Sequence, residues 1–249
     1  MKKRACIVMP TYNEAANLRE LLPRIFREAE NIPTHELHLL VVDDKSPDGT
    51  AAVVSEWMAK DPRIHLLSGD KKGLGEAYKR GFAHAIESLA PELIIQMDAD
   101  QQHDPALLPL FVSLPQYGFT LVIGSRFAPG AGKPALTTWR RFLSDLATVL
   151  VRKAAGLPRL YDCTSGYRCI AVDVLKQCDF RNLSTQGYSF QSSLLSELFR
   201  NGVRVVEIPI LFGPRAHGTS KLHMNDQIEF LTNIGRLWLR RIGEPRAVK

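Results

Sequence analysis

Residues 93–105 read LIIQMDADQQHDP, an apolar run that passes directly into a cluster of acids. The apolar part predicts a buried strand. In an extended chain alternate side chains share a face, so Asp98 and Asp100 point together if the extended geometry continues. Carboxylate oxygens suit Mg²⁺ or Mn²⁺, which also accept water and phosphate ligands. The stretch therefore predicts a strand with a divalent-metal site at its carboxyl end, which Gln102 is placed to join.

His103 and the D-x-D pair each allow a second interpretation. His103 can serve as a ligand or a base, or it can hold the loop together. We prefer the structural role, because Asp98, Asp100 and Gln102 already suffice for a metal. A D-x-D pair alone also fits a solvated acidic turn, but its position at a strand end favours the metal site.

Apolar runs alternate with helical patterns along the first half of the chain. The runs predict strands at 5–10, 37–42, 64–68, 93–98 and 120–126. The intervening segments predict helices at 13–30, 50–60, 73–88 and 105–114. Continuously apolar strands that alternate with helices are typical of a parallel sheet covered on both faces. Ligands of such sheets bind beyond the carboxyl ends of the strands.

Polar clusters follow four of these strands at that edge. They are PTYNE (10–14), DDKSPDGT (43–50), DADQQHD (98–104) and GSR (124–126). A carboxylate after the second strand, such as Asp44, can accept hydrogen bonds from a base or a ribose. A capped turn is the alternative for Asp44, and a stronger one for Asp48. The agreement of four separate segments predicts a binding site at this edge.

The second half of the chain carries basic segments. Arg126 follows a strand, and Arg215 and Lys221 lie in a glycine-containing loop that is able to fold over a site. Guanidinium and ammonium groups are natural partners of phosphate oxygens. The segment KKGLGEAYKRG (71–81) lacks the G-K-[ST] of a phosphate loop, so it predicts a turn into a helix that backs the site.

Helices are expected at 137–156, after 162–170, at 187–202 and at 227–243, with a strand at 203–212. Tyr188, Phe190 and Gln191 either line an acceptor channel or belong to the core. The amphipathic, basic helices at 138–155 and 226–241 either lie on an anionic membrane surface or pack on the sheet. We expect one domain over 1–249, in which about 225–249 form an amphipathic helix and tail.

Composition narrows the class of protein. The 249 residues carry a net charge of +6, which suits an anionic ligand, a nucleic acid or an anionic membrane. No apolar run approaches the roughly 20 residues of a membrane-spanning helix. The four cysteines form no C-x-x-C pair, which favours reduced thiols in the cytoplasm. We therefore expect a cytoplasmic protein that is peripheral on the cytoplasmic face of a membrane.

Eight segments together resemble the family-2 glycosyltransferases, and most closely the dolichol-phosphate (polyprenol-phosphate) mannose synthases. They are MPTYNEAANL, VVDDKSPDGT, KKGLGEAY, MDADQQHDP, GSR, TSGYR, GYSFQ and PILFGPRAHGTSKL, in family order over roughly residues 5–224. The resemblance implies a GT-A fold, an α/β architecture with a mostly parallel central sheet flanked by helices and with C-terminal amphipathic helices.

The resemblance also implies roles for individual residues. The guanine nucleotide pocket would be lined by Pro10, Tyr12, Glu14, Val42 and Asp44. The metal and the sugar nucleotide diphosphate would be held by Asp98, Ala99, Asp100 and Gln102. Donor and acceptor phosphates would be bound by Arg126, Arg215 and Lys221, which with Asp100 form the catalytic set.

Two features depart from the family pattern. Lys45 stands where relatives often have a small residue, and the chain stops at Lys249 without the C-terminal transmembrane helices of many relatives. The second departure leaves membrane attachment to surface helices or to a separate membrane subunit.

The implied reaction is inverting, metal-dependent transfer of mannose from GDP-mannose to dolichyl or polyprenyl phosphate. Transfer of glucose or another hexose from a UDP-sugar to polyprenyl phosphate stays open. A D-x-D phosphatase is disfavoured by Gln101 and Gln102, and a dinucleotide oxidoreductase by the missing G-x-G-x-x-G. Nucleic-acid binding rests on net charge alone, and we expect none.

Overall fold

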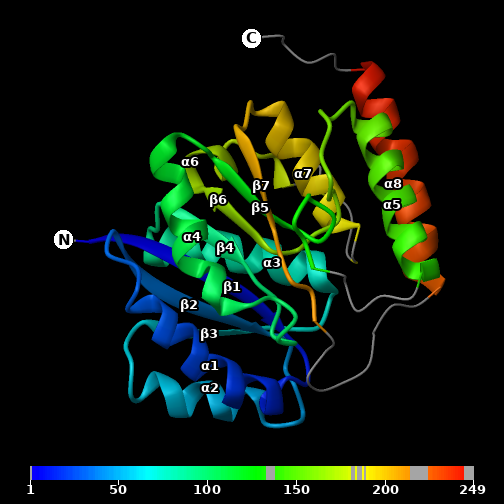
Figure 1. Ribbon diagram of the computed structural model, residues 1–249. Coiled ribbons are helices and arrows are strands. Elements are labelled where there is room, and N and C mark those ends of the chain that lie inside the picture. Colours follow the sequence, from blue (N-terminus) through cyan, green and yellow to red (C-terminus); the bar gives the residue numbers. More distant parts are fainter. Residues whose placement is uncertain are drawn as a thin grey trace.

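A seven-stranded sheet lies at the centre of the molecule, with strand order β3-β2-β1-β4-β6-β5-β7 (Figure 1). The computed structural model describes residues 2–132, 138–180, 183, 187, 189–213 and 224–243; in the helices that begin at 138 and 224, side chains are described from 144 and 228 onward. The strands are β1 (Lys3–Thr11), β2 (His35–Asp43), β3 (Ile64–Ser68), β4 (Leu93–Gln96), β5 (Leu121–Ser125), β6 (Arg168–Ala171) and β7 (Val205–Pro209).

The sheet is parallel except at β6, which runs antiparallel between β4 and β5. The expected strands are confirmed with small shifts at their ends. The sequence did not predict β6, a four-residue strand with a charged residue, Arg168, at its start. Its antiparallel insertion makes the sheet mostly rather than wholly parallel.

Helices cover both faces of the sheet (Figure 1). Alternate residues of β1 explain why its sequence is continuously apolar: Ile7 packs in one hydrophobic cluster and Val8 in the other. The first cluster includes α1 (Ala15–Ala29), α2 (Thr50–Met58) and α4 (Leu108–Ser113). The second includes α3 (Leu74–His84), α5 (Thr138–Ala155), α7 (Phe190–Arg200) and α8 (Met224–Gly243).

Short helical segments complete the fold. The expected helix at 105–114 is divided into η2 (Pro105–Leu107), α4 and η3 (Leu114–Tyr117), and α3 continues as a π-helical turn, η1 (Ala85–Leu89). The helix expected after 162–170 is the single turn α6 (Val172–Leu175). In α3, a Cβ on Gly81 would lie 2.5 Å from a methyl carbon of Val8, so this glycine lets the helix approach the sheet closely.

The loops after three parallel strands share one backbone feature. Asn13 after β1, Lys45 after β2 and Gln101 after β4 have φ values of 59°, 51° and 65°. This left-handed conformation is uncommon for residues other than glycine and is concentrated at functional loops. Three of the four described non-glycine residues with positive φ thus lie at the carboxyl edge of the sheet, where the sequence predicts the binding site; the fourth, Ala90, precedes β4.

Candidate functional site

Asp98 and Asp100 follow β4 and lie beside Tyr78 of α3. The Tyr78 hydroxyl donates to Asp98 Oδ1 over 3.3 Å. Burial raises the pKa of Tyr78 well above its ordinary value, and the carboxylates of Asp98 and Asp100 raise it further. Tyr78 is therefore protonated at neutral pH and acts as a hydrogen-bond donor. The two carboxylates share one locality, as the D-x-D pattern predicts.

The donor set fits a divalent cation that binds together with a diphosphate. Within the described part of the chain, no three His, Cys, Asp or Glu side chains gather closely enough to hold a metal by themselves. The Asp98 side chain is 39% exposed. Gln102 Nε2 donates to the Gly213 carbonyl over 2.8 Å, and an amide binds a metal through its oxygen, so this bond is compatible with a ligand role. Mg²⁺ and Mn²⁺ commonly take their remaining ligands from water and phosphate.

His103 holds Asp98 in place. Its ring is 3% exposed and lies parallel to the Tyr167 ring, with 4.7 Å between ring centroids. The Asp98 backbone N–H donates to His103 Nδ1 over 3.0 Å, so Nδ1 is an acceptor and the neutral ring carries its proton on Nε2. Burial lowers the pKa of His103 to about 4. These contacts favour the structural role over that of a base.

His103 should make the protein less stable in acid. Its folded-state pKa of about 4 lies below the ordinary 6.5, so the unfolded chain takes up the proton first as the pH falls. The stabilisation is complete above about pH 6.5 and is lost as the pH falls toward 4, by about 3 kcal/mol in total. Urea unfolding at several pH values checks this result. A His103→Gln variant should lose most of this pH dependence and a matched His84→Gln variant should keep it; equal slopes for all three proteins would contradict the assignment.

The predicted nucleotide pocket lies at the ends of β1 and β2. Pro10 pairs with Val42 in the sheet register. The Tyr12 ring lies under the Lys71 ammonium, 3.5 Å from Nζ to the ring centroid. Asp44 is buried and accepts from Arg80 over 2.8 Å. Burial raises the pKa of Asp44, and Arg80 offsets part of that rise.

Other acidic residues of these loops form local hydrogen bonds. Glu14 precedes α1 and accepts from Asn17 Nδ2 over 2.6 Å. Asp48 accepts from the backbone N–H of Thr50 and of Ala15, each over 3.0 Å. The turn interpretation of Asp48 is confirmed. The predicted nucleotide role of Glu14 stays a prediction.

Lys45 stands where relatives often have a small residue, and the backbone conformation at this position bears on that difference. The positive φ of 51° at this position favours glycine, and after it asparagine or aspartate, over lysine. Lys45 Nζ lies 2.6 Å from Asp70 Oδ1, and both side chains are exposed. An exposed ion pair of this kind adds little stability, so Lys45 is tolerated here rather than required.

Arg126 follows β5 and forms a buried ion pair that the sequence did not reveal. Its Nε and a terminal nitrogen donate to the two Asp162 oxygens over 2.7 and 2.8 Å, and that terminal nitrogen also reaches Thr164 Oγ1 over 2.7 Å. Burial lowers the pKa of Arg126, but Asp162 raises it more, so the net shift is upward. The pair fixes the guanidinium beside the Phe212 ring, 5.5 Å away. Its predicted phosphate contact stays a prediction.

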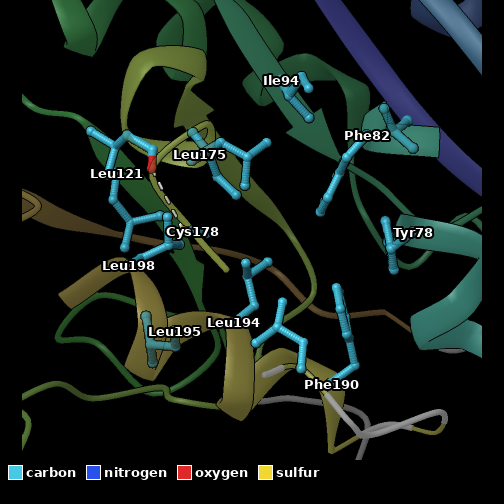
Figure 2. Close-up of a cluster of buried hydrophobic side chains, with 14 of the residues drawn as sticks. Tyr78, Phe82, Ile94, Leu121, Leu175, Cys178, Phe190, Leu194, Leu195 and Leu198 are labelled. Atoms are coloured by element: carbon cyan, nitrogen blue, oxygen red, sulfur yellow. Dashed lines mark hydrogen bonds between the residues drawn. The ribbon is translucent and has the colours of Figure 1, made fainter. Parts of the chain in front are cut away.

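Several predicted residues lie elsewhere or outside the described residues. Ala99 is buried between the two aspartates. Phe190 belongs to the core, where its ring stacks on Tyr78 with centroids 5.7 Å apart (Figure 2), so it does not line a channel. Tyr188, Arg215 and Lys221 fall outside the described residues.

Sequence reasoning missed Lys71 and Asp162. Lys71 was placed in a structural turn, yet its ammonium lies on the Tyr12 ring. Asp162 lies in the segment DCTSGYR, and the family resemblance implied no role for this residue. An arginine that follows a strand suggests a carboxylate partner, but spacing in the sequence does not identify which carboxylate pairs with Arg126.

Comparison with known proteins identifies the family. Residues 6–176 match the model of "Glycosyl transferase family 2". The chain is 35% identical to the polyprenol monophosphomannose synthase of Mycolicibacterium smegmatis, covering 99% of this chain and 91% of that protein. It is 37% identical to the undecaprenyl-phosphate mannosyltransferase of Micrococcus luteus, covering 94% and 93%.

A solved structure confirms the fold. Glucosyl-3-phosphoglycerate synthase from Mycobacterium tuberculosis, crystallised with Mn²⁺, UDP and glucosyl-3-phosphoglycerate, superimposes with a TM-score of 0.66 at 20% identity, over 98% of this chain and 82% of that one. The expected GT-A architecture is therefore confirmed. The chain is a glycosyltransferase and belongs to glycosyl transferase family 2.

Proposed function

We propose that the protein transfers mannose from GDP-mannose to dolichyl or polyprenyl phosphate, with inversion and with Mg²⁺ or Mn²⁺ as cofactor. The observation that carries this proposal is the near full-length similarity to two enzymes named for mannose transfer to polyprenyl phosphates. The carboxylate pair after β4 supports it, because Asp98 and Asp100 would hold a divalent cation that neutralises the charge of a sugar nucleotide diphosphate.

In this proposal Asp98, Asp100 and Gln102 hold the cation and the donor diphosphate. A divalent cation bound there would neutralise the charge that builds on the leaving nucleoside diphosphate. Tyr78 donates to the Asp98 carboxylate, and His103 accepts from the Asp98 backbone N–H, so both residues position Asp98. Arg126, oriented by Asp162, would stabilise phosphate charge from the other side.

The acceptor supplies its own nucleophile. A phosphate monoester oxygen is anionic at neutral pH, so the reaction requires no strong general base. The ring beside Asp98, that of His103, has a pKa of about 4 and is too weak a base for a neutral hydroxyl. Positioning of the two substrates then supplies most of the rate, and in-line attack gives β-mannosyl phosphate from an α-linked donor.

We further propose that α5 and α8 attach the protein to the cytoplasmic face of a membrane, with or without a separate membrane subunit. None of the described helices is both long and apolar enough to cross a bilayer. The two helices pack side by side (Figure 1). Large apolar side chains of α8 are exposed at helical spacing: Ile228, Leu231, Trp238, Leu239 and Ile242.

A basic pocket adjoins this apolar stripe. It has a volume of about 500 Å³ and is lined by Val149, Arg152, Lys153, Gly156, Leu157 and Arg241. Three cations beside exposed apolar residues complement the headgroups of anionic lipids. The other interpretation, in which α5 and α8 only pack on the sheet, accounts for Leu237 but not for the exposed stripe.

Trp238→Ser/Leu239→Ser should weaken binding to anionic vesicles by at least about tenfold, because each side chain would bury apolar area in the lipid. The two side chains are 53% and 63% exposed, so folding should be unaffected. Vesicle co-sedimentation and circular dichroism check both points. The control variant Leu110→Ser/Tyr117→Ser removes exposed apolar residues outside α8 and should bind vesicles like the wild type. Unchanged vesicle binding by the α8 variant would contradict the membrane role.

The donor is tested by offering GDP-mannose or UDP-glucose with a short polyprenyl phosphate and Mg²⁺, and following labelled sugar into a lipid extract. Transfer from GDP-mannose supports the mannose reaction. Transfer from UDP-glucose alone would keep the fold and the acceptor but replace the donor.

A further inference from the structure

Gln191, the second residue of α7, presents a side-chain nitrogen beside the proposed metal ligand Asp98. A Cβ built on Gly166 would lie 3.3 Å from Gln191 Nε2 and 3.6 Å from Asp98 Oδ2. The glycine thus keeps open a small space that both atoms border. The residue is only 4% exposed, and Nε2 donates none of the hydrogen bonds found among the described residues. Nε2 is not one of the fully buried polar atoms that lack a partner, so it reaches the accessible space.

The amide is held in this orientation by Gln96 at the end of β4. Gln96 Nε2 donates to Gln191 Oε1 over 3.2 Å. Because the Gln191 oxygen accepts this bond, its nitrogen is the atom that faces the space over Gly166. Gln191 Nε2 is therefore an accessible donor at the tip of an otherwise buried side chain, and a ligand oxygen in this space can accept a hydrogen bond from it.

Arg168 places a buried positive charge beside the backbone of Gln191. Its side chain is fully buried and donates to the Gln191 carbonyl over 2.8 Å and to the Cys163 carbonyl over 3.1 Å. Burial lowers its pKa to about 10, so it stays cationic at neutral pH. Within the described residues, its bonded partners are carbonyls and no carboxylate forms an ion pair with it. A buried cation of this kind favours an anion nearby.

We propose that Gln191 donates a hydrogen bond to a phosphate oxygen of a bound substrate over Gly166, and that Arg168 is a positioning residue that holds Gln191 there. The oxygen belongs either to the acceptor phosphate or to the donor diphosphate. The inference rests on the proposed transfer reaction, and goes beyond it by assigning Gln191 a direct substrate contact.

Gln191→Met keeps the size of the side chain but removes the donor. It should lower kcat/KM for transfer by about 10-fold to 100-fold, as for other hydrogen bonds to charged groups. A higher KM for one substrate identifies which phosphate is bound. Gln191→Glu should be more impaired, because it places a carboxylate beside the phosphate, and it should recover activity as the pH falls and the acid regains a donor proton. A packing role would not produce that pH profile.

A binding measurement keeps the test independent of turnover. The side-chain amide signals of ¹⁵N-glutamine-labelled protein include one that disappears in Gln191→Met. That signal should shift when either a short isoprenyl phosphate or GDP-mannose with Mg²⁺ is added, and the ligand that shifts it is the source of the oxygen. Wild-type kcat/KM in Gln191→Met, or an unshifted signal with both ligands bound, would overturn the inference. Absence of transfer by the wild-type protein would instead overturn the proposed function, and the amide signal would still test the contact.

Discussion

Asp100→Asn should lower sugar transfer by about 10³-fold, the loss expected when a metal site that stabilises a leaving diphosphate is disabled. Asp100 is buried beside Asp98, and its Oδ1 accepts from the Gln102 backbone N–H over 3.2 Å. Asparagine retains an oxygen for that bond but lacks the charge that a divalent cation requires. Steady-state transfer with titrated Mg²⁺ or Mn²⁺ measures the loss.

Asp104→Asn is the matched control in the same loop. Asp104 pairs with Arg24, and its Oδ1 caps the Ala106 N–H over 3.2 Å, a role that asparagine also fills. Its transfer rate should stay within about twofold of wild type. A folded Asp100→Asn protein that retained transfer within tenfold of wild type would contradict the metal assignment.

Asp162→Asn should lower the free energy of unfolding by about 3–5 kcal/mol, because it leaves the Arg126 guanidinium buried without its counter-charge. Asp162 is fully buried and also accepts from the backbone N–H groups of Arg126, Thr164 and Ser165. Urea unfolding at neutral pH gives the difference. Transfer should also fall, since Arg126 loses the partner that fixes its orientation.

Asp61→Asn tests the same change at a less buried ion pair. Asp61 and Arg63 lie 2.6 Å apart with side chains 19% and 32% exposed, so this variant should cost about 1 kcal/mol or less. The double variant Arg126→Met/Asp162→Asn removes the unpaired cation and keeps an acceptor oxygen for the backbone N–H groups, so it should recover much of the stability but none of the transfer. An Asp162→Asn loss no larger than that of Asp61→Asn would contradict the buried-pair account.

The architecture followed from sequence because central parallel strands such as β1 are apolar on both faces. Ile7 and Val8 enter opposite clusters, so β1 reads as an unbroken apolar run, and the polar segments then mark the carboxyl ends. The strand β6 was not predicted because it has only four residues and begins with a charged residue, Arg168. Arg168 can be buried only because it donates to carbonyls of Cys163 and of Gln191 in α7.

The D-x-D pair was predictable because its two members are close in sequence. The ion pair of Arg126 with Asp162 was not, because 36 positions separate the partners and no local pattern links them. Lys71 over Tyr12 is a similar case, in which two loops meet only after β1, β2 and β3 have paired. Sequence patterns thus located the edge of the sheet where the candidate site lies, while contacts between loops define the geometry of that site.

The most direct test of the account is transfer of labelled mannose from GDP-mannose by the purified protein, with polyprenyl phosphate and the unphosphorylated polyprenol as alternative acceptors, each with Mg²⁺ and with excess chelator. We predict mannosyl lipid from the phosphate only, and only with the metal, because the site relies on an acceptor that is already anionic. Equal transfer to the alcohol, or transfer to the phosphate that persists in chelator, would contradict it.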